Sequence, residues 1–284
     1  MTQTTVQISR PDCRSEYAPL KQVLLCSPRF LEIREVINRT QRHFADENID
    51  REKAQQQHQH LIDVLEQLGV KVILLQPDPR FSEQVFTRDI GFTIGPRLYI
   101  SRMEKSIRQG EENLLTGWLQ REGIPFSRIT EGNIEGGDVL IDEDTLYIGD
   151  SGRTSRKAIA TLRQELPHLN VVSLHFPEKY LHLDCLFNPL SSREALIYPQ
   201  AFADSDLRRL ASRYSLIEIN EDEQFRLGTN VLSIGNRTVI SQPVNPDVNK
   251  KLRQRGFTVI EVDLSEITKS GGAFRCCTLP LLRG

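Results

Sequence analysis

The segment SGGAFRCCTLPLL, from Ser270 to Leu282, places two adjacent thiols between a glycine pair and an apolar run. This pattern predicts a strand that begins at Cys276 and continues into a buried stretch. Since strand side chains alternate between faces, we expect Cys276 and Thr278 to share one face and Cys277 to take the other. Taken alone, the segment favours core packing over catalysis, because free cysteine is among the most buried residue types.

Length and composition limit the classes of protein to which the chain can belong. The 284 residues suit one large domain or two ordinary ones, and the formal net charge of −2 argues against nucleic acid or an anionic membrane as the main partner. Five cysteines without a Cys-x-x-Cys pair predict neither a disulfide framework nor a zinc site, and they indicate a reducing compartment. Residues 1–17 lack the apolar core of a secretion signal, and no run is long enough to span a bilayer, so we expect a cytoplasmic protein.

One pattern of elements recurs four times along the chain, in the order strand, strand, helix, strand. The first strands of the four units are GFTIG (91–95), DVLID (138–142), DCLFN (184–188) and NVLSI (230–234). The polar residues that open these strands, followed by the first thiol, are Asp89, Asp138, Asp184, Asn230 and Cys276. Successive positions differ by 49, 46, 46 and 46 residues. Such a regular period is typical of radial or stacked repeats.

The N-terminal region supplies what a fifth unit starting at Cys276 lacks. KQVLLC (21–26) and VKVILL (70–75) have the composition of strands, and residues 47–68 have helical spacing between them. We therefore predict an α/β fold in which five such modules form a ring that closes through both chain termini, over residues 1–284.

A closed ring also predicts a pocket. The starts of the five first strands converge near one pseudo-symmetry axis, so three aspartates, an asparagine and a cysteine are expected to meet there. This convergence makes a catalytic Cys276 the favoured interpretation. For Asn230 an ordinary strand-start cap remains favoured, and Asp138 is expected to cap backbone amides.

Four short motifs resemble those of the guanidine-modifying enzyme superfamily, which includes arginine deiminases, dimethylarginine dimethylaminohydrolases and amidinotransferases. They are FTRD (86–89), EGGD (135–138), HLD (182–184) and FRCCT (274–278), and EYAPLKQVLLCSP (16–28) is similar to the first strand of that family. The resemblance covers nearly the whole chain. It implies a five-bladed α/β propeller, as the repeat predicts, and a single catalytic domain over residues 1–284. No motif in the sequence signals a cofactor or a bound metal, and we expect neither.

The resemblance also implies a reaction. Cys276 is the expected nucleophile and forms a covalent amidino-thioether that water hydrolyses, His182 acts as acid and then as base, and Glu135 orients His182. The residue types suit the chemistry, because a guanidinium carbon is a poor electrophile that needs a strong nucleophile and a proton for its leaving amine.

Five further residues are expected to bind the substrate. By the resemblance, Asp89 and Asp184 hold the guanidinium, while Arg108 and Arg153 bind the α-carboxylate. Glu83 stands where the hydrolases usually have Asn or Asp, and its longer side chain either reaches the guanidinium or displaces it. Two buried carboxylates at one site are costly without a cation, which favours a cationic ligand.

These features favour hydrolysis of arginine to citrulline and ammonia, since an aspartate at position 184 is typical of relatives that take an unmethylated guanidinium. Dimethylarginine hydrolysis and a dihydrolase reaction that continues to ornithine stay open as alternatives. Arg275, where amidinotransferases usually have histidine, favours a hydrolase over a transferase. A non-catalytic arginine-binding protein is the alternative outside enzymes. We expect a small-molecule guanidino partner, and whether the chain forms a homo-oligomer is left open.

Overall fold

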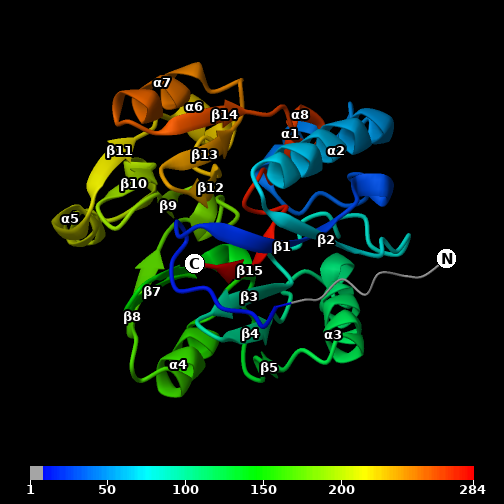
Figure 1. Cartoon of the computed structure of the whole chain (residues 1–284), viewed down its shortest axis with the longest axis horizontal. Coiled ribbons are helices and arrows are strands. Elements are labelled where there is room, and N and C mark those ends of the chain that lie inside the picture. Colours follow the sequence, from blue (N-terminus) through cyan, green and yellow to red (C-terminus); the bar gives the residue numbers. More distant parts are fainter. Residues whose placement is uncertain (1–8) are drawn as a thin grey trace.

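The computed structural model describes residues 9–284. Part of the segment 1–17, for which no secretion signal is expected, therefore lies outside the described residues. The described chain forms five three-stranded sheets arranged around a common centre (Figure 1). The predicted five-bladed α/β propeller is thereby confirmed.

Four of the blades follow the predicted order. The first comprises β3 (Gly91–Ile94), β4 (Arg97–Ile100), α3 (Glu111–Arg121) and β5 (Phe126–Arg128). The second comprises β6 (Val139–Asp142), β7 (Thr145–Asp150), α4 (Arg156–Glu165) and β8 (Asn170–His175). The third comprises β9 (Phe187–Pro189), β10 (Glu194–Ile197), α5 (Asp204–Arg213) and β11 (Ser215–Glu218). The fourth comprises β12 (Leu232–Gly235), β13 (Thr238–Ser241), α7 (Pro246–Gln254) and β14 (Thr258–Glu261).

Strand pairing is the same in every blade. The middle strand is antiparallel to the first strand and parallel to the third, as β7 is to β6 and β8. A parallel pair needs a crossover connection, and in each of these four blades a helix supplies it. Because one face of the crossover helix packs on its sheet, each blade carries its own apolar layer; in α4 the buried residues are Ala158, Ile159 and Leu162.

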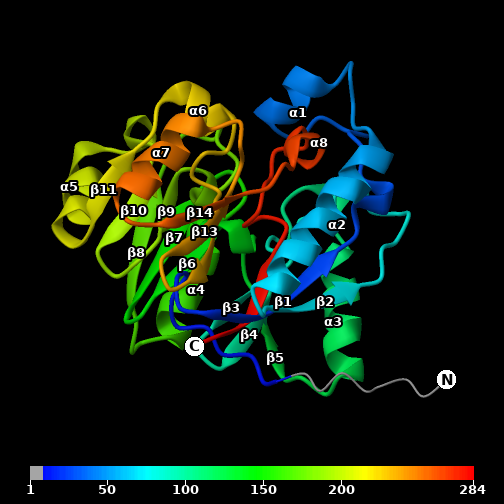
Figure 2. The same ribbon diagram turned by 45° about the horizontal axis from the view of Figure 1, so that its top comes forward.

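The fifth blade joins the two ends of the chain. Its strands are β15 (Leu279–Arg283), β1 (Leu20–Cys26) and β2 (Lys71–Leu75), and its long helix is α2 (Arg51–Gln67). β1 is antiparallel to β15 and parallel to β2, and β1 and β15 lie side by side near the centre of the ring (Figures 1 and 2). The predicted closure through the terminal strands is confirmed.

Short elements outside the repeat surround the ends of the strands. The α-helices are α1 (Arg39–Phe44), α6 (Glu221–Phe225) and α8 (Ser265–Thr268). The 3₁₀ turns are η1 (Pro28–Phe30), η2 (Ser106–Arg108), η3 (Gly136–Asp138), η4 (Leu183–Cys185) and η5 (Pro199–Ala201). α1 and α8 lie next to each other on one side of the propeller (Figure 2). Within residues 9–284, no helix has both the length and the apolar character that a bilayer crossing requires.

The start of the fifth blade differs from the prediction. Cys276 lies in a turn and not in a strand, because the Cys277 N–H donates to the carbonyl of Ala273, the Thr278 N–H donates to that of Arg275, and β15 begins only at Leu279. The expected alternation of faces at positions 276–278 is therefore wrong. Gly272 permits the turn, since a Cβ there would lie 2.4 Å from the ring of Phe86.

Candidate active site

The starts of three blades meet at the sulfur of Cys276. The Nδ2 of Asn230 donates to this sulfur over 3.3 Å, and both carboxylate oxygens of Asp184 lie 3.9 Å from it. All three side chains are buried, and that of Cys276 is 1% exposed. The predicted convergence of strand starts therefore holds for these residues.

Asn230 does more than a strand-start cap would. Its Oδ1 accepts the backbone N–H groups of Arg275 (3.0 Å) and Cys276 (3.3 Å), so its amide fixes the turn and contacts the sulfur at once. The cap predicted for Asn230 is thus present, and the contact with the sulfur is additional to it. The signal was present in the spacing, which puts Asn230 midway between Asp184 and Cys276, 46 residues from each.

His182 and Glu135 form a buried pair beside the sulfur site. The Nε2 of His182 lies 2.8 Å from Oε2 of Glu135, and its Nδ1 lies 3.5 Å from Oδ1 of Asp89. Among the described residues, this Nδ1 has no hydrogen-bond partner. Gly137 lets the ring approach, since a Cβ there would lie 2.7 Å from Nδ1. One nitrogen of the imidazole is thus held and the other is available for proton transfer.

The surrounding charges fix the protonation of this pair. Burial by itself would lower the pKa of His182, but the nearby carboxylates outweigh burial and raise the pKa to about 10. Asp89 contributes most to this rise, followed by the Glu135 hydrogen bond and Asp138. Burial would raise the pKa of Glu135, but the His182 hydrogen bond and the charge of Arg153 lower it to about 2. Both shifts favour an imidazolium paired with a carboxylate.

Asp89 is brought to the site but already has a cationic partner. The Nη1 of Arg108 lies 2.6 Å from Oδ2 of Asp89, and the same guanidinium bonds Glu111 at 2.8 Å through Nη2. Arg108 is 2% exposed, so its charge is enclosed by these carboxylates. The other oxygen of Asp89 is buried and has no hydrogen-bond partner within residues 9–284. Glu111, the first residue of α3, was not predicted from sequence.

Glu83 lies at the edge of the same group. Its Oε2 is 3.9 Å from Nε of Arg108, and its Oε1 accepts a hydrogen bond from Gln41 of α1. Burial raises the pKa of the Glu83 carboxyl, although the charge of Arg108 opposes this rise. Gln41 also bonds Ser270 at 3.0 Å, and Asn38 donates to the carbonyl of Ser270. The segment around α1 is thus tied to the site, a link that sequence reasoning missed.

Arg153 connects the site to a hollow at the surface. Its Nη1 lies 3.3 Å from Oε2 of Glu135, and its Nη2 donates to the carbonyl of Ile37 at 3.0 Å. The hollow has a volume of about 650 Å³, and its charged lining includes the cations Arg153, Arg42, Lys105 and Lys179 and the carboxylates Glu35, Glu104 and Glu178. Arg153 therefore reaches from the buried Glu135 to this surface hollow.

A buried ionic network lies under the site. The carboxylate of Glu16 bonds both Arg88 (2.9 Å) and Arg275 (2.9 Å), the residues that precede Asp89 and Cys276 in the chain. The Nε of Arg275 lies 3.7 Å from Asp184. Arg88 and Arg275 together lower the pKa of Glu16 to about 2 against the effect of its burial. The network holds two strand starts at a fixed separation.

Two groups of donor atoms near the site are close enough to surround an ion. Within the described chain they are Asp89, Glu135 and His182, and Asp184, Cys185 and Cys276; in each group the donor atoms lie within 4.8 Å of one another. Both groups belong to the convergence of strand starts described above. Donor groups of this kind suit a ligand cation as well as a metal ion.

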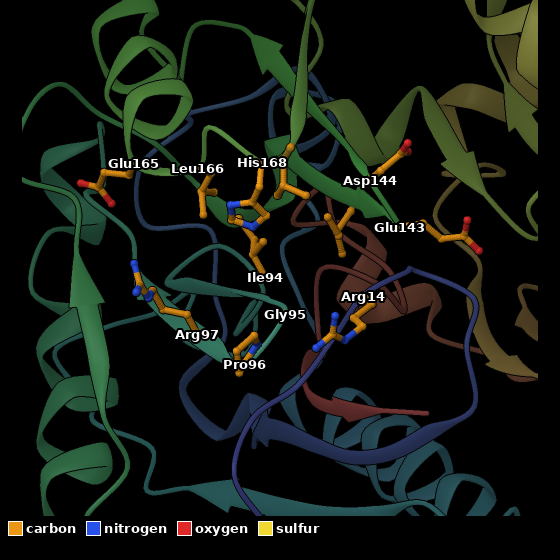
Figure 3. Close-up of a pocket in the computed structure, with 12 residues that line it drawn as sticks. Arg14, Ile94, Gly95, Pro96, Arg97, Glu143, Asp144, Glu165, Leu166 and His168 are labelled. Atoms are coloured by element: carbon orange, nitrogen blue, oxygen red, sulfur yellow. The ribbon is translucent and has the colours of Figure 1, made fainter.

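A second hollow lies elsewhere, beside the hairpin turns of the first two blades (Figure 3). It has a volume of about 540 Å³, and side chains of both charges, among them Arg14, Arg97, Glu143 and Glu165, surround an apolar floor. None of the predicted site residues is part of its lining, which is drawn from the described residues. This hollow is therefore separate from the candidate site at the centre of the ring.

Comparison with known proteins identifies the family of the chain. The family model described as N,N dimethylarginine dimethylhydrolase, eukaryotic, matches residues 28–283. An uncharacterized protein of Bacillus subtilis, YkgA, is 52% identical over 96% of this chain and 95% of its own length. The dimethylarginine dimethylaminohydrolase of Mycobacterium tuberculosis is 30% identical over 82% of this chain and 77% of its own length.

Solved structures give the same result for the fold. The N-terminal domain of ArgZ, an arginine dihydrolase from cyanobacteria solved with its product, has a TM-score of 0.84 at 28% identity and covers 92% of this chain and 97% of its own. The chain spans only 37% of the full bifunctional ArgZ of Synechocystis. Together with the five-bladed ring and the site at its centre, these matches show that the chain belongs to the guanidine-modifying enzyme superfamily, in the family of the dimethylarginine dimethylhydrolases.

Proposed function

We propose that the chain hydrolyses the guanidino group of arginine to give citrulline and ammonia, through a covalent amidino-thioether on Cys276. The observation that carries the proposal is the position of Asp184, whose two oxygens both lie 3.9 Å from the Cys276 sulfur. A guanidinium held by this carboxylate has its carbon next to the sulfur. Such positioning turns a bimolecular attack into an intramolecular one.

The proposed reaction has two halves. In the first, the sulfur of Cys276 bonds to the guanidinium carbon and ammonia leaves with a proton from Nδ1 of His182. In the second, water attacks the same carbon, His182 takes a proton from it, and the thiolate departs as citrulline forms. Glu135 supports the charged imidazole through its 2.8 Å contact with Nε2. Asn230 supports the thiolate through its amide donor.

The proposed role of Arg108 is to bind the substrate's α-carboxylate, and its bond to Asp89 suggests how substrate binding would release it for that role. Its guanidinium now bonds Asp89, which is one of the two carboxylates proposed for the substrate guanidinium. An arriving substrate cation takes over Asp89, which releases Nη1 of Arg108 to bind the substrate's α-carboxylate together with Arg153, while Nε and Nη2 of Arg108 stay bonded to Glu111. Two arginines suit this carboxylate, since a planar guanidinium can donate two parallel hydrogen bonds to it.

Two related reactions have a specific observation in their favour. The matching family model favours dimethylarginine as the substrate. The likeness to ArgZ, named as an arginine dihydrolase, favours a second hydrolysis that continues from citrulline to ornithine. Deimination of arginine is preferred here because a dimethylated nitrogen has no N–H to donate, and Asp184 or Asp89 would then lose a hydrogen bond in a buried site.

The test is incubation with arginine, asymmetric dimethylarginine and agmatine, followed by separation of the products. Citrulline and ammonia from arginine support the proposal, ornithine supports the dihydrolase, and dimethylamine supports the dimethylarginine reaction. Acid quenching during turnover should add a substrate-derived mass to the peptide that contains Cys276. Arginine binding without any product would instead indicate a binding protein, and Cys276→Ser provides the blank.

A further inference from the structure

The proposed reaction leaves one buried thiol of the site unused. Cys185 ends the η4 turn, is 2% exposed, and has its sulfur within 4.8 Å of the Cys276 sulfur. The same Nδ2 of Asn230 that donates to Cys276 at 3.3 Å lies 4.0 Å from the sulfur of Cys185. Two reduced thiols thus face one amide donor, with the carboxylate of Asp184 beside both.

We propose that Cys185 is a resolving thiol, and that oxidation of Cys276 by a hydroperoxide ends in a reversible Cys185–Cys276 disulfide. The proposal concerns the chemistry of the two sulfurs and does not depend on which guanidino compound is the substrate. It requires only that a small peroxide can reach Cys276, the position that the proposed substrate must also reach.

The oxidation has two balanced steps. The thiol of Cys276 gives up its proton and its sulfur attacks one peroxide oxygen, so that an S–O bond forms and the O–O bond breaks. Sulfur loses two electrons, and the departing oxygen takes up the proton that the thiol released and leaves as water or an alcohol. The sulfur of Cys185 then attacks that of Cys276, an S–S bond forms and the S–O bond breaks. The hydroxide that leaves takes the Cys185 proton and becomes water.

Asp184 is placed to carry that proton. The thiol of Cys185 donates to Oδ1 of Asp184 over 3.5 Å, and both Asp184 oxygens also lie 3.9 Å from the Cys276 sulfur. Burial raises the pKa of the Asp184 carboxyl, which makes it a better proton acceptor than an exposed aspartate. The carboxylate can therefore take the proton from Cys185 as it attacks and pass it to the leaving oxygen.

The distance between the two sulfurs is compatible with a disulfide after side-chain rotation. A disulfide needs about 2.05 Å between sulfurs, so a starting separation within 4.8 Å leaves at most about 2.8 Å to be shared between two side chains. The other thiols are placed differently. Cys13 and Cys26 direct their sulfurs to the carbonyls of Pro280 and Ser27. Cys277 follows Cys276 directly, and a disulfide between adjacent residues closes a strained eight-membered ring.

The test uses the full chain and hydrogen peroxide, without substrate. We expect the wild type to lose two titratable thiols, to yield a crosslinked pair of peptides containing Cys185 and Cys276, and to return to the reduced mass with dithiothreitol. In Cys185→Ser, peroxide should leave sulfinic and sulfonic acid on Cys276, which dithiothreitol does not reverse. Recovery of the reduced Cys276 peptide should fall at least about tenfold relative to wild type.

Cys277→Ser is the matched control and should form the crosslink as the wild type does. A crosslink between Cys276 and Cys277, a disulfide between two chains on a non-reducing gel, or equal recovery in wild type and Cys185→Ser would each overturn the proposal. Cys185→Ala, compared by circular dichroism, replaces the serine variant if the latter does not fold. Because peptide masses give the result, a chain that fails to hydrolyse arginine still tests the disulfide.

Discussion

Asp138 and Asp184 occupy equivalent positions, at the starts of the second and third blades, but the hydrogen bonds of their carboxylates differ. The carboxylate of Asp138 accepts the backbone N–H of Leu183 at 2.8 Å and the hydroxyl of Ser151 at 2.6 Å. That of Asp184 accepts only the weak thiol donors of Cys185 and Cys276 among the described hydrogen bonds. Both carboxylates are fully buried.

The difference shows how a symmetric ring separates support from chemistry. Burial raises the pKa of Asp138 to about 6 and also raises that of Asp184, so both carboxylates bear a desolvation cost. At Asp138 the protein's own donors offset that cost. At Asp184 the nearest cation is Arg275, whose Nε is 3.7 Å away, and a ligand cation can supply the remaining donors. The poorly bonded member of an equivalent set is thus the one to expect at a binding site.

The largest expected effect is the loss of turnover when the sulfur of Cys276, which lies beside Asp184, is replaced. Cys276→Ser should reduce turnover by about 10⁵-fold or more, since a hydroxyl is a far weaker nucleophile than a thiolate. Cys277→Ser should keep most of the activity, because Cys277 is fully buried and burial raises the pKa of its thiol well above the ordinary value. Steady-state rates with arginine measure both. Equal losses in the two variants would mean that the wrong sulfur has been assigned.

The second prediction tests the two aspartates directly. Wild type should prefer arginine over asymmetric dimethylarginine by roughly 10⁴ in kcat/KM, because dimethylation removes two donors from a site built around carboxylates. Asp184→Asn should lower kcat/KM for arginine and shrink this preference. Asp138→Asn should lower the melting temperature and leave the preference nearly unchanged, because its hydrogen bonds are internal.

Either of two results would contradict the assignment of Asp184 to substrate binding and Asp138 to structural support. One is a wild type that prefers the dimethylated substrate. The other is an Asp138→Asn variant that changes the ratio of specificity constants as much as Asp184→Asn does. Circular dichroism of both variants separates loss of fold from loss of selectivity.

The repeat explains why so much of the fold was predictable. The predicted first strands of the four blades, the two N-terminal strands and the helix predicted within residues 47–68 lie within a few residues of the observed elements, because each blade repeats the same alternation and the 46-residue spacing fixes the phase. The approach of Asp184 and Asn230 to Cys276 followed from the same spacing. The span of one catalytic domain over residues 1–284 and the roles of the site residues stay predictions.

What sequence could not predict depends on contacts that follow no period. The segment around Cys276 has the apolar pattern of a strand. Only the hydrogen bonds from the Cys277 N–H to the Ala273 carbonyl and from the Thr278 N–H to the Arg275 carbonyl distinguish a turn from a strand there. Gln41 lies outside the repeat, and its bond to Glu83 joins residues 42 positions apart. No local pattern identifies such a partner.

The third prediction concerns a link between Asp138 and substrate binding. The hydroxyl of Ser151 donates to Asp138 and accepts the backbone N–H of Arg153. Asp138 thus helps to position Arg153, one of the two arginines proposed to bind the substrate's α-carboxylate. Agmatine, which lacks the α-carboxylate, should have a kcat/KM at least about a hundredfold below that of arginine, since each lost charge-assisted contact is worth about 1.5–3 kcal/mol. Comparable constants for the two compounds would remove Arg108 and Arg153 from substrate binding.

The smallest expected effect is the pH dependence of stability that His182 contributes. Its pKa in the folded chain is raised to about 10 from an ordinary value near 6.5, and Asp138 is one of the carboxylates that raise it. A group whose pKa is raised on folding stabilises the fold fully below its unfolded pKa, and this contribution is lost as the pH rises through the folded pKa. The free energy of unfolding of wild type relative to His182→Gln should therefore be greatest near pH 6 and decline toward pH 10.

The decline cannot exceed about 1.4 kcal/mol per pH unit, because a single proton is involved. Urea denaturation at pH 6, 8 and 10 measures it in the two proteins. Asp138→Asn removes one of the charges that raise the pKa of His182 in the folded chain, so in that background the decline should begin at the same pH and end at a lower one. A difference between wild type and His182→Gln that stays constant from pH 6 to pH 10 would mean that folding does not raise the pKa of His182. Asp138 would then act on the site through its hydrogen bonds alone. Asp138 and Asp184 would differ in their hydrogen-bond donors but not in their electrostatic effect on His182.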